Sequence, residues 1–166
     1  MRFLRLAFIL IFLHPGLALH AATEGELKAA YVLKFATFVT WPDDAPTNVF
    51  TIGVAGSSDI ARHVERAAVG LRVRNRPVIV KRVTSQADAT GCQLVYFASE
   101  KDASILAGLR GSAVLTVGES DSFCSKGGII GLKQVGTKLR FTINQTTASK
   151  ARLGLSAQLL RLALPE

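Results

Sequence analysis

Few side chains in this sequence have the types and spacing that chemistry requires. His63 is the only histidine beyond the first twenty residues, and it stands between basic residues on a predicted helix. A Ser/His/Asp or Cys/His arrangement would need this histidine, and no nucleophile motif surrounds it. A zinc site would have too few ligands. The sequence therefore predicts no catalytic residue, no metal site and no cofactor, and it argues against an enzyme.

The two cysteines, Cys92 and Cys124, are the other reactive groups. A disulfide between them would restrict the unfolded chain by about 3.7 kcal/mol in the loop-entropy model. Cys92 opens a predicted strand, however, and Cys124 follows the far end of the next one. These two edges lie about 20 Å apart unless the connection runs back across the sheet. Both outcomes stay open, a disulfide or two buried thiols, and this geometry favours the thiols.

Three polar segments follow predicted strands, at residues 56–59, 99–100 and 118–121. Parallel strands bring such segments to one edge of a sheet, where small ligands bind in many α/β proteins. The first segment is not a dinucleotide-binding loop, because Ala55 and Ser58 occupy positions where the GxGxxG motif needs glycine. A small-ligand-binding module is therefore an alternative function.

The element that must position everything else is the stretch 27–42, LKAAYVLKFATFVTWP. We expect a central packing helix that Pro42 stops after Trp41, with Thr37 on its polar side. Lys28 projects from the apolar arc, and it either extends its ammonium past the helix end or pairs with a partly buried carboxylate. A helical period places eight residues on that wide arc, namely Leu27, Ala29, Tyr31, Val32, Phe35, Ala36, Phe38 and Val39.

Short apolar runs and helical segments alternate through the middle of the chain, which predicts parallel βαβ units. We expect strands near 49–55, 77–83, 92–98 and 113–117, and helices near 60–68 and 100–110. Strands at 129–135 and 138–144 are joined by two residues and must form an antiparallel hairpin. The sequence thus predicts a single α/β domain, with a mainly parallel sheet, flanking helices and a terminal hairpin.

A last predicted helix carries leucines at 155, 159, 160 and 162. This stripe is either part of the core or the face of a homodimer.

The first 22 residues have the features of a signal peptide. Arg2 and Arg5 precede an apolar run at 6–13 that is too short to span a bilayer, and small residues follow that allow cleavage near 18–22. No cysteine follows this run at the position a lipid anchor would need. We therefore expect residues 23–166 to form a periplasmic domain without a lipid anchor.

The positive charge of the chain is concentrated in one stretch. Without Arg2 and Arg5, 18 basic and 12 acidic side chains remain, and residues 62–82 alone hold seven basic residues and one acid. If the segment before the strand at 77–83 is extended, Arg72, Arg74 and Arg76 share one face and are candidates for binding a partner. Aromatic residues are not interleaved with the basic ones, so a nucleic acid is not expected as a partner.

Several landmarks occur in an order that resembles the YfiR family of small periplasmic proteins. They are LKAAYVLKFATFVTWPDDAP, FTIGVAGSSD, RPVIVKRV, GCQLVYFASE, AVLTVGESDSF, GGIIGLKQVGTKLRFTIN and LGLSAQLLRLA. The first stretch is the most specific, and its signature residues are Lys28, Ala29, Ala30, Tyr31, Phe35, Phe38, Trp41 and Pro42.

The resemblance implies an α/β sandwich and a regulatory function. The better-known member of the family represses an inner-membrane diguanylate cyclase, which links envelope stress to cyclic-di-GMP and biofilm formation. It holds the periplasmic domain of the cyclase inactive until an outer-membrane lipoprotein sequesters it. Redox-linked members carry more than one cysteine pair, so redox sensing is not expected to transfer to a chain with only Cys92 and Cys124.

Overall fold

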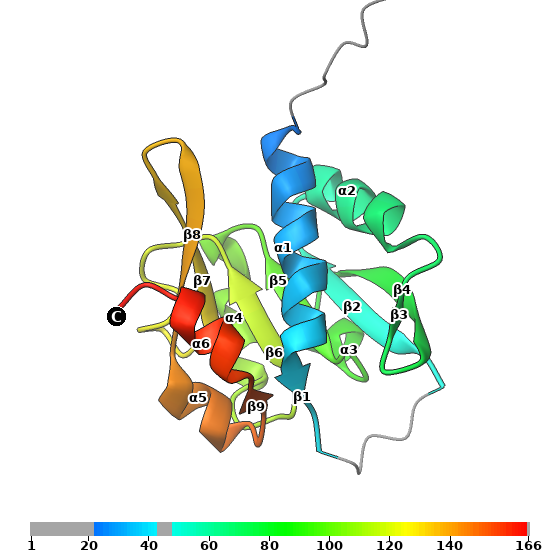
Figure 1. Cartoon of the computed structure of the whole chain (residues 1–166). Coiled ribbons are helices and arrows are strands. Elements are labelled where there is room, and N and C mark those ends of the chain that lie inside the picture. Colours follow the sequence, from blue (N-terminus) through cyan, green and yellow to red (C-terminus); the bar gives the residue numbers. More distant parts are fainter. Residues whose placement is uncertain (1–21, 43–47, 166) are drawn as a thin grey trace, which may run out of the picture.

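A seven-stranded sheet forms the middle layer of the computed structural model, which describes residues 22–42 and 48–165 (Figure 1). Its five inner strands are parallel, and an antiparallel strand closes each edge. This confirms the predicted α/β fold with a mainly parallel sheet and a terminal hairpin. In spatial order the strands are β3 (Arg72–Val73), β4 (Arg76–Val83), β2 (Phe50–Ala55), β5 (Leu94–Phe97), β6 (Leu115–Gly118), β7 (Ile130–Val135) and β8 (Lys138–Ile143).

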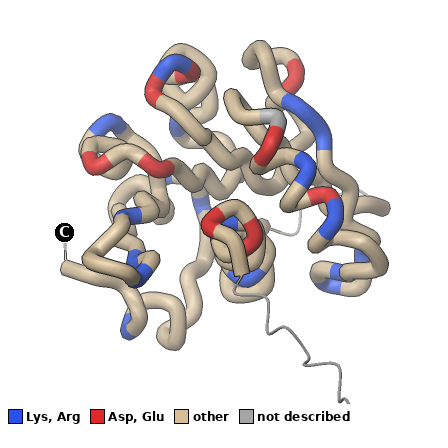
Figure 2. The backbone as a smooth tube through the Cα atoms, turned by 90° about the horizontal axis from the view of Figure 1, so that it is seen from above, with Lys and Arg blue, Asp and Glu red and all other residues tan. Residues whose placement is uncertain are grey.

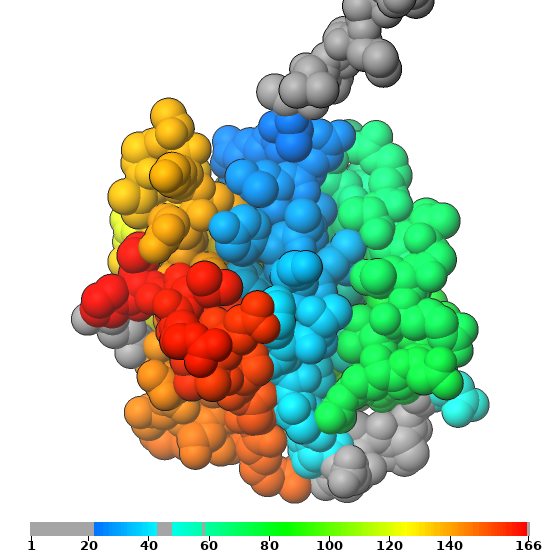
Figure 3. Space-filling view, in the orientation of Figure 1, coloured from blue at the N-terminus to red at the C-terminus, as the bar shows by residue number. Residues whose placement is uncertain are grey.

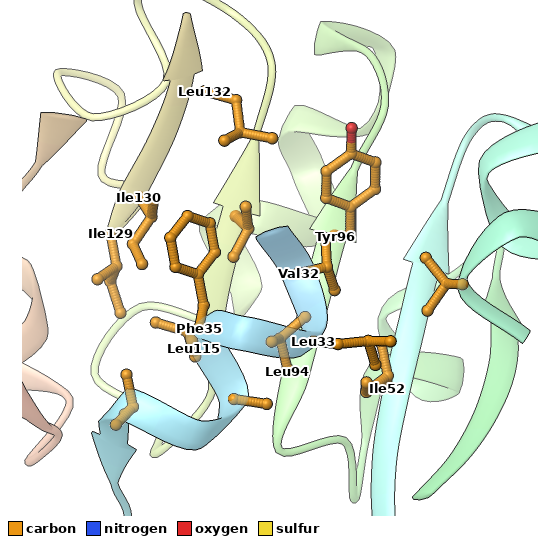
Figure 4. Close-up of a cluster of buried hydrophobic side chains, with 14 of the residues drawn as sticks. Val32, Leu33, Phe35, Ile52, Leu94, Tyr96, Leu115, Ile129, Ile130 and Leu132 are labelled. Atoms are coloured by element: carbon orange, nitrogen blue, oxygen red, sulfur yellow. The ribbon is translucent and has the colours of Figure 1, made fainter. Parts of the chain in front are cut away.

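Helices cover both faces of this sheet. On one face α1 (Glu24–Phe38) and α2 (Ser58–Ala68) pack over the larger core, where Val32, Leu33 and Phe35 meet the strands (Figure 4). On the other face α3 (Gln86–Ala89), the 3-10 helix η1 (Glu100–Asp102) and α4 (Ala103–Gly108) lie over a smaller core. The chain ends with α5 (Gln145–Lys150), β9 (Gly154–Leu155) and α6 (Ala157–Leu162).

Helix α1 begins with a capping box and ends earlier than predicted. The Thr23 hydroxyl accepts from the Glu26 backbone N–H, and the Glu26 carboxylate accepts from the Thr23 N–H. The prediction that the helix continues to Pro42 is wrong, because Val39–Thr40 form strand β1, which pairs with β9. Pro42 restricts only the residue before it, whereas pairing with β9 ends the helix several residues sooner.

The predicted burial of α1 is largely confirmed. Val32, Phe35 and Ala36 are buried and Thr37 is exposed. Leu33, which the predicted arc leaves out, is also buried, in the core between α1 and the sheet. Leu27 is 39% exposed, so the flank of α1 that faces away from α2 is open to solvent.

The leucines near the C-terminus divide between the core and the surface. Leu159 is 2% exposed, whereas Leu162 is 55% exposed. Leu155 lies in β9, so α6 is shorter than the predicted helix. The two-residue pairing of β1 with β9 fixes this terminal segment to the end of α1.

Cys92 and Cys124 do not form a disulfide, and both are buried. Cys92 Sγ lies against Gly53 of β2, and Cys124 Sγ lies against Gly131 of β7. These strands are three steps apart in the sheet, which is about 14 Å and too far for a bridge. Burial raises the pKa of the Cys92 thiol, which lowers its reactivity at neutral pH.

The predicted signal peptide lies outside the described residues except for Ala22. Among the residues that the structure does describe, no helix is long and apolar enough to cross a membrane.

We expect Phe35→Ala to lower the free energy of unfolding by about 3–5 kcal/mol, because it removes a ring that is 2% exposed from the centre of the core. Thr37→Ala is the matched control on the same helix and should cost less than about 1 kcal/mol. Urea denaturation of both variants measures the difference. Equal losses would show that α1 does not pack through the face described above.

We expect thiol titration of the denatured, unreduced protein to find both cysteines reactive. The separation of the two sulfur atoms by three strands is the physical reason. A result of no reactive thiols would mean that the protein forms a disulfide that this fold does not accommodate.

Candidate functional site

The polar segments after the parallel strands do meet at one edge of the sheet, but they leave little space. Ser99, Glu100, Glu119 and Ser120 line a cavity of about 20 Å³, room for roughly one water molecule. The Glu100 carboxylate accepts from Ser122 at 2.8 Å. Hydrogen bonds from Ser120, Lys126 and Ser122 lower the pKa of Glu100 to about 2. The polar side chains of these segments therefore form hydrogen bonds with one another.

The third predicted segment, residues 56–59, begins helix α2 at the same edge. The Ser57 hydroxyl caps the helix by accepting from the Asp59 and Ile60 backbone N–H groups. Gly56 has a φ of 90° and packs against Asp102 and Ser99. The edge of the sheet thus brings all three predicted segments together without forming a pocket for a metabolite.

The signature residue Lys28 pairs with a partly buried carboxylate. Its Nζ lies 2.5 Å from Glu119 Oε2 and 2.5 Å from Glu24 Oε1, and its side chain is 14% exposed. Burial alone would lower the pKa of Lys28, but hydrogen bonds to Glu119 and Glu24 outweigh it and raise that pKa. This confirms the predicted pairing of Lys28 with a partly buried carboxylate, and not the alternative in which its ammonium extends past the helix end.

Glu119 also binds Tyr96, the buried tyrosine of strand β5. The Tyr96 hydroxyl donates to Glu119 Oε1, and burial followed by the negative charge of Glu119 raises the pKa of Tyr96. One carboxylate at the end of β6 thus joins the first turns of α1 to β5. We interpret this network as structural, because Tyr96 is 0% exposed and its hydroxyl is already engaged.

Other signature residues also anchor α1. The Trp41 indole N–H donates to the Gln93 carbonyl at 3.0 Å, and its ring packs edge to face on Phe50. The Tyr31 hydroxyl donates to the Leu139 carbonyl at 3.0 Å. Ala29 is buried, Ala30 is exposed, and Phe38 and Pro42 are half-buried.

An apolar groove lies beside α1, between this helix, β8 and α6, three elements that meet on the face in Figure 3. Its volume is about 480 Å³. Tyr31, Phe35 and Phe141 form an aromatic floor, with ring centroids 5.1–6.2 Å apart in edge-to-face contacts. Leu27 and Leu162 are the exposed apolar residues at its margins. The sequence analysis did not predict this groove. The only sequence signal for it was the leucine stripe of the last predicted helix, where polar residues stand between the leucines.

The polar groups around the groove are cationic or neutral. Lys34, Arg140 and Gln158 line it, and none of its described lining residues is acidic. Neither Lys34 nor Arg140 belongs to an ion pair with another described residue. An anionic group of a partner would therefore find two cations beside the apolar floor.

The groove belongs to a second basic region of the chain. Residues 129–165 contain six basic residues and no acid, namely Lys133, Lys138, Arg140, Lys150, Arg152 and Arg161. Beyond residue 22 and outside 62–82, eleven basic and eleven acidic residues balance in number but not in space, because all of these acids except Glu166 precede residue 122. Figure 2 shows basic positions on both flanks of the molecule, with the acidic first turn of α1 between them.

The predicted arrangement of Arg72, Arg74 and Arg76 on one extended face is wrong. Arg74 and Asn75 have φ values of 50° and 65° and form the two-residue turn between β3 and β4. Arg72 donates to the Asn75 carbonyl, Arg74 donates to the Trp41 carbonyl, and the Arg76 guanidinium lies 5.5 Å from the Phe50 ring centroid. The three arginines would share one face only in an extended segment, and the turn between β3 and β4 reverses the direction of the chain instead. Their binding of a partner stays a prediction.

His63 is half-buried, with its ring packed against Gly25 of α1. Within the described part of the chain, no group of three or more His, Cys, Asp or Glu residues is placed to hold a metal ion.

We expect Lys28→Met to lower the free energy of unfolding by about 1–3 kcal/mol, because it leaves the Glu119 carboxylate partly buried without its ammonium partner. Lys34→Met is the matched control, an exposed lysine on the same helix whose replacement should cost no more than about 0.5 kcal/mol. Urea denaturation compares them. A loss as small in the first variant as in the second would contradict the structural role of this pair.

Comparison with solved structures shows the same fold in distant proteins. A conserved domain protein of Vibrio cholerae O1 biovar El Tor matches with a TM-score of 0.55 and 15% identity, over 84% of this chain and 59% of that one. The ABC domain of Streptococcus pneumoniae in complex with L-Trp matches with a TM-score of 0.53 and 15% identity, over 81% and 59%. This chain thus spans about 59% of each of these structures.

No curated protein matches the sequence. A family model described as YfiR/HmsC-like matches residues 25–164, which include the signature helix, every strand of the sheet and α6. This match supports a periplasmic regulatory role. The chain belongs to the YfiR/HmsC-like family.

Proposed function

We propose that this protein represses an inner-membrane diguanylate cyclase by binding the periplasmic domain of that enzyme, and so lowers cyclic-di-GMP. Membership of the YfiR/HmsC-like family supports a regulator of this kind. The observation that carries the proposal is the groove between α1, β8 and α6. The resemblance further implies an outer-membrane lipoprotein that competes for the repressor.

The groove has the features of a docking site for a protein segment. Its aromatic floor is wide enough to receive a large apolar side chain, the type of residue that contributes most to protein interfaces. Leu162 at its margin is 55% exposed and would lose water on binding. The hydrogen bond of Tyr31 to the Leu139 carbonyl holds this side chain in place, so it loses little conformational entropy when a partner binds.

Charge specifies the segment further. Lys34 and Arg140 favour a partner in which an aspartate or glutamate flanks the apolar anchor. The basic residues of β8, α5 and α6 extend this positive field beyond the groove, which speeds encounter with an acidic domain at low salt. We expect association to slow as the salt concentration rises.

Binding of a small ligand is the second candidate function. The groove volume lies within the range of small-molecule sites, whereas the cavity at the strand edge does not. A ligand at this position would compete with the proposed protein segment. Thermal denaturation with periplasmic metabolites separates the two functions, since a bound ligand raises the midpoint.

We expect Leu162→Glu to abolish repression, because it places a carboxylate in the apolar groove at a position that contributes little to stability. The measurement is the cyclic-di-GMP content of cells that produce the exported protein. Val69→Glu is the matched control, since Val69 is 83% exposed and caps the C-terminal end of α2, a helix that does not line the groove.

Wild type and the Val69 variant should lower cyclic-di-GMP equally, and the Leu162 variant should not lower it. Periplasmic levels of all three proteins are compared by immunoblot. Full repression by the Leu162 variant would remove the groove from the mechanism. No effect of the wild type would contradict the proposed function itself.

A further inference from the structure

The outer edge of β4 is unpaired along most of its length within the described part of the chain. This strand has eight residues, and β3 pairs only with the first two of them, through Arg72↔Pro77 and Val73↔Arg76. One more bond, from the Val78 N–H to the Leu71 carbonyl, continues this contact. Beyond Val78, β4 is the edge of the seven-stranded sheet.

The hairpin register shows which backbone groups point outward. Val73 and Arg76 flank a two-residue turn and so exchange both of their hydrogen bonds. Every second residue after Arg76 therefore directs its N–H and C=O away from β2, as the Val78 bond confirms. Val80 and Arg82 follow this rule, and neither backbone N–H has a partner among the described residues.

The side chains along this edge are apolar and basic. Ile79 is 46% exposed, and Arg82 is exposed without an ion pair among the described residues. Lys81 donates to the Thr90 carbonyl, which holds its charge near the strand. The stretch 62–82, which ends here, holds seven basic residues and one acid.

We propose that β4 is a second interface, where an extended acidic segment of a partner protein adds to the sheet as a further strand. Open N–H and C=O groups supply the backbone hydrogen bonds of such strand addition, and exposed Ile79 supplies an apolar contact. The basic edge selects acidic side chains. It also disfavours a second copy of this chain, because pairing of two β4 strands would oppose like charges.

This interface is independent of the groove, because α1 and the sheet separate β4 from β8. The two can therefore be tested apart. A capped peptide of about eight residues that alternates valine with aspartate serves as the probe, and one that alternates valine with lysine serves as its control.

Amide hydrogen exchange by NMR tests the proposal on the wild-type protein. In the free protein the Val80 and Arg82 amides should exchange quickly, whereas the Ile79 and Lys81 amides, which point toward β2, should be protected. The acidic peptide at saturation should slow exchange at Val80 and Arg82 by at least about tenfold. The basic peptide should leave both unchanged.

Val80→Pro removes one outward N–H, and proline is tolerated at edge positions of this kind. We expect it to weaken binding of the acidic peptide by at least about tenfold in fluorescence anisotropy, and Arg82→Glu to weaken it at low salt.

Three results would overturn the proposal. The first is unchanged exchange at Val80 and Arg82 with saturating acidic peptide. The second is equal affinity for wild type and a folded Val80→Pro variant. The third is protection of these amides by concentration-dependent dimerisation without peptide, which would assign the edge to a second copy. None of these results bears on the groove, whose test uses cyclic-di-GMP.

Discussion

The packing of α1 on the sheet holds the two ends of the chain and the larger core together. Phe35 is buried at its centre, and Lys28 and Trp41 fix its two ends through Glu119 and the Gln93 carbonyl. One flank of the helix is covered by α2 and is closed. The other faces β8 and the short helix α6, which cannot cover it fully, so the groove arises where the helical layer is incomplete. Residues that hold the fold together thereby also shape the surface offered to a partner.

Two surfaces of the molecule combine incomplete packing with positive charge. In the groove, Lys34 and Arg140 lie beside an aromatic floor. At the β4 edge, Arg82 lies beside unpaired backbone groups. They lie on opposite flanks of α1, and the acidic first turn of that helix separates them (Figure 2). Separate surfaces allow a regulator to bind two partners at the same time, whereas partners that compete for it can share one surface.

The order and type of the main elements could be predicted because each depends on a local pattern. Apolar runs mark the inner strands, and the wide arc marks α1. The pair β1 and β9 could not be found, since two residues give no periodicity and the partners are far apart in sequence. The arginine face was mispredicted because Asn75 and Arg74 adopt the left-handed region of a hairpin turn, for which Asn is the local signal. The groove needs three elements brought together by tertiary packing, which no single stretch encodes.

We propose that the groove between α1, β8 and α6 receives the periplasmic domain of a diguanylate cyclase. Site-specific photocrosslinking in living cells tests it most directly, with a photoreactive phenylalanine analogue in place of Leu162 or, for comparison, of Val69. We expect the probe at Leu162 to crosslink to an inner-membrane protein that mass spectrometry identifies as having a diguanylate cyclase domain, and the probe at Val69 to give no such product. The same crosslink from Val69, or none from Leu162 in a protein that still represses, would show that the groove does not bind the cyclase.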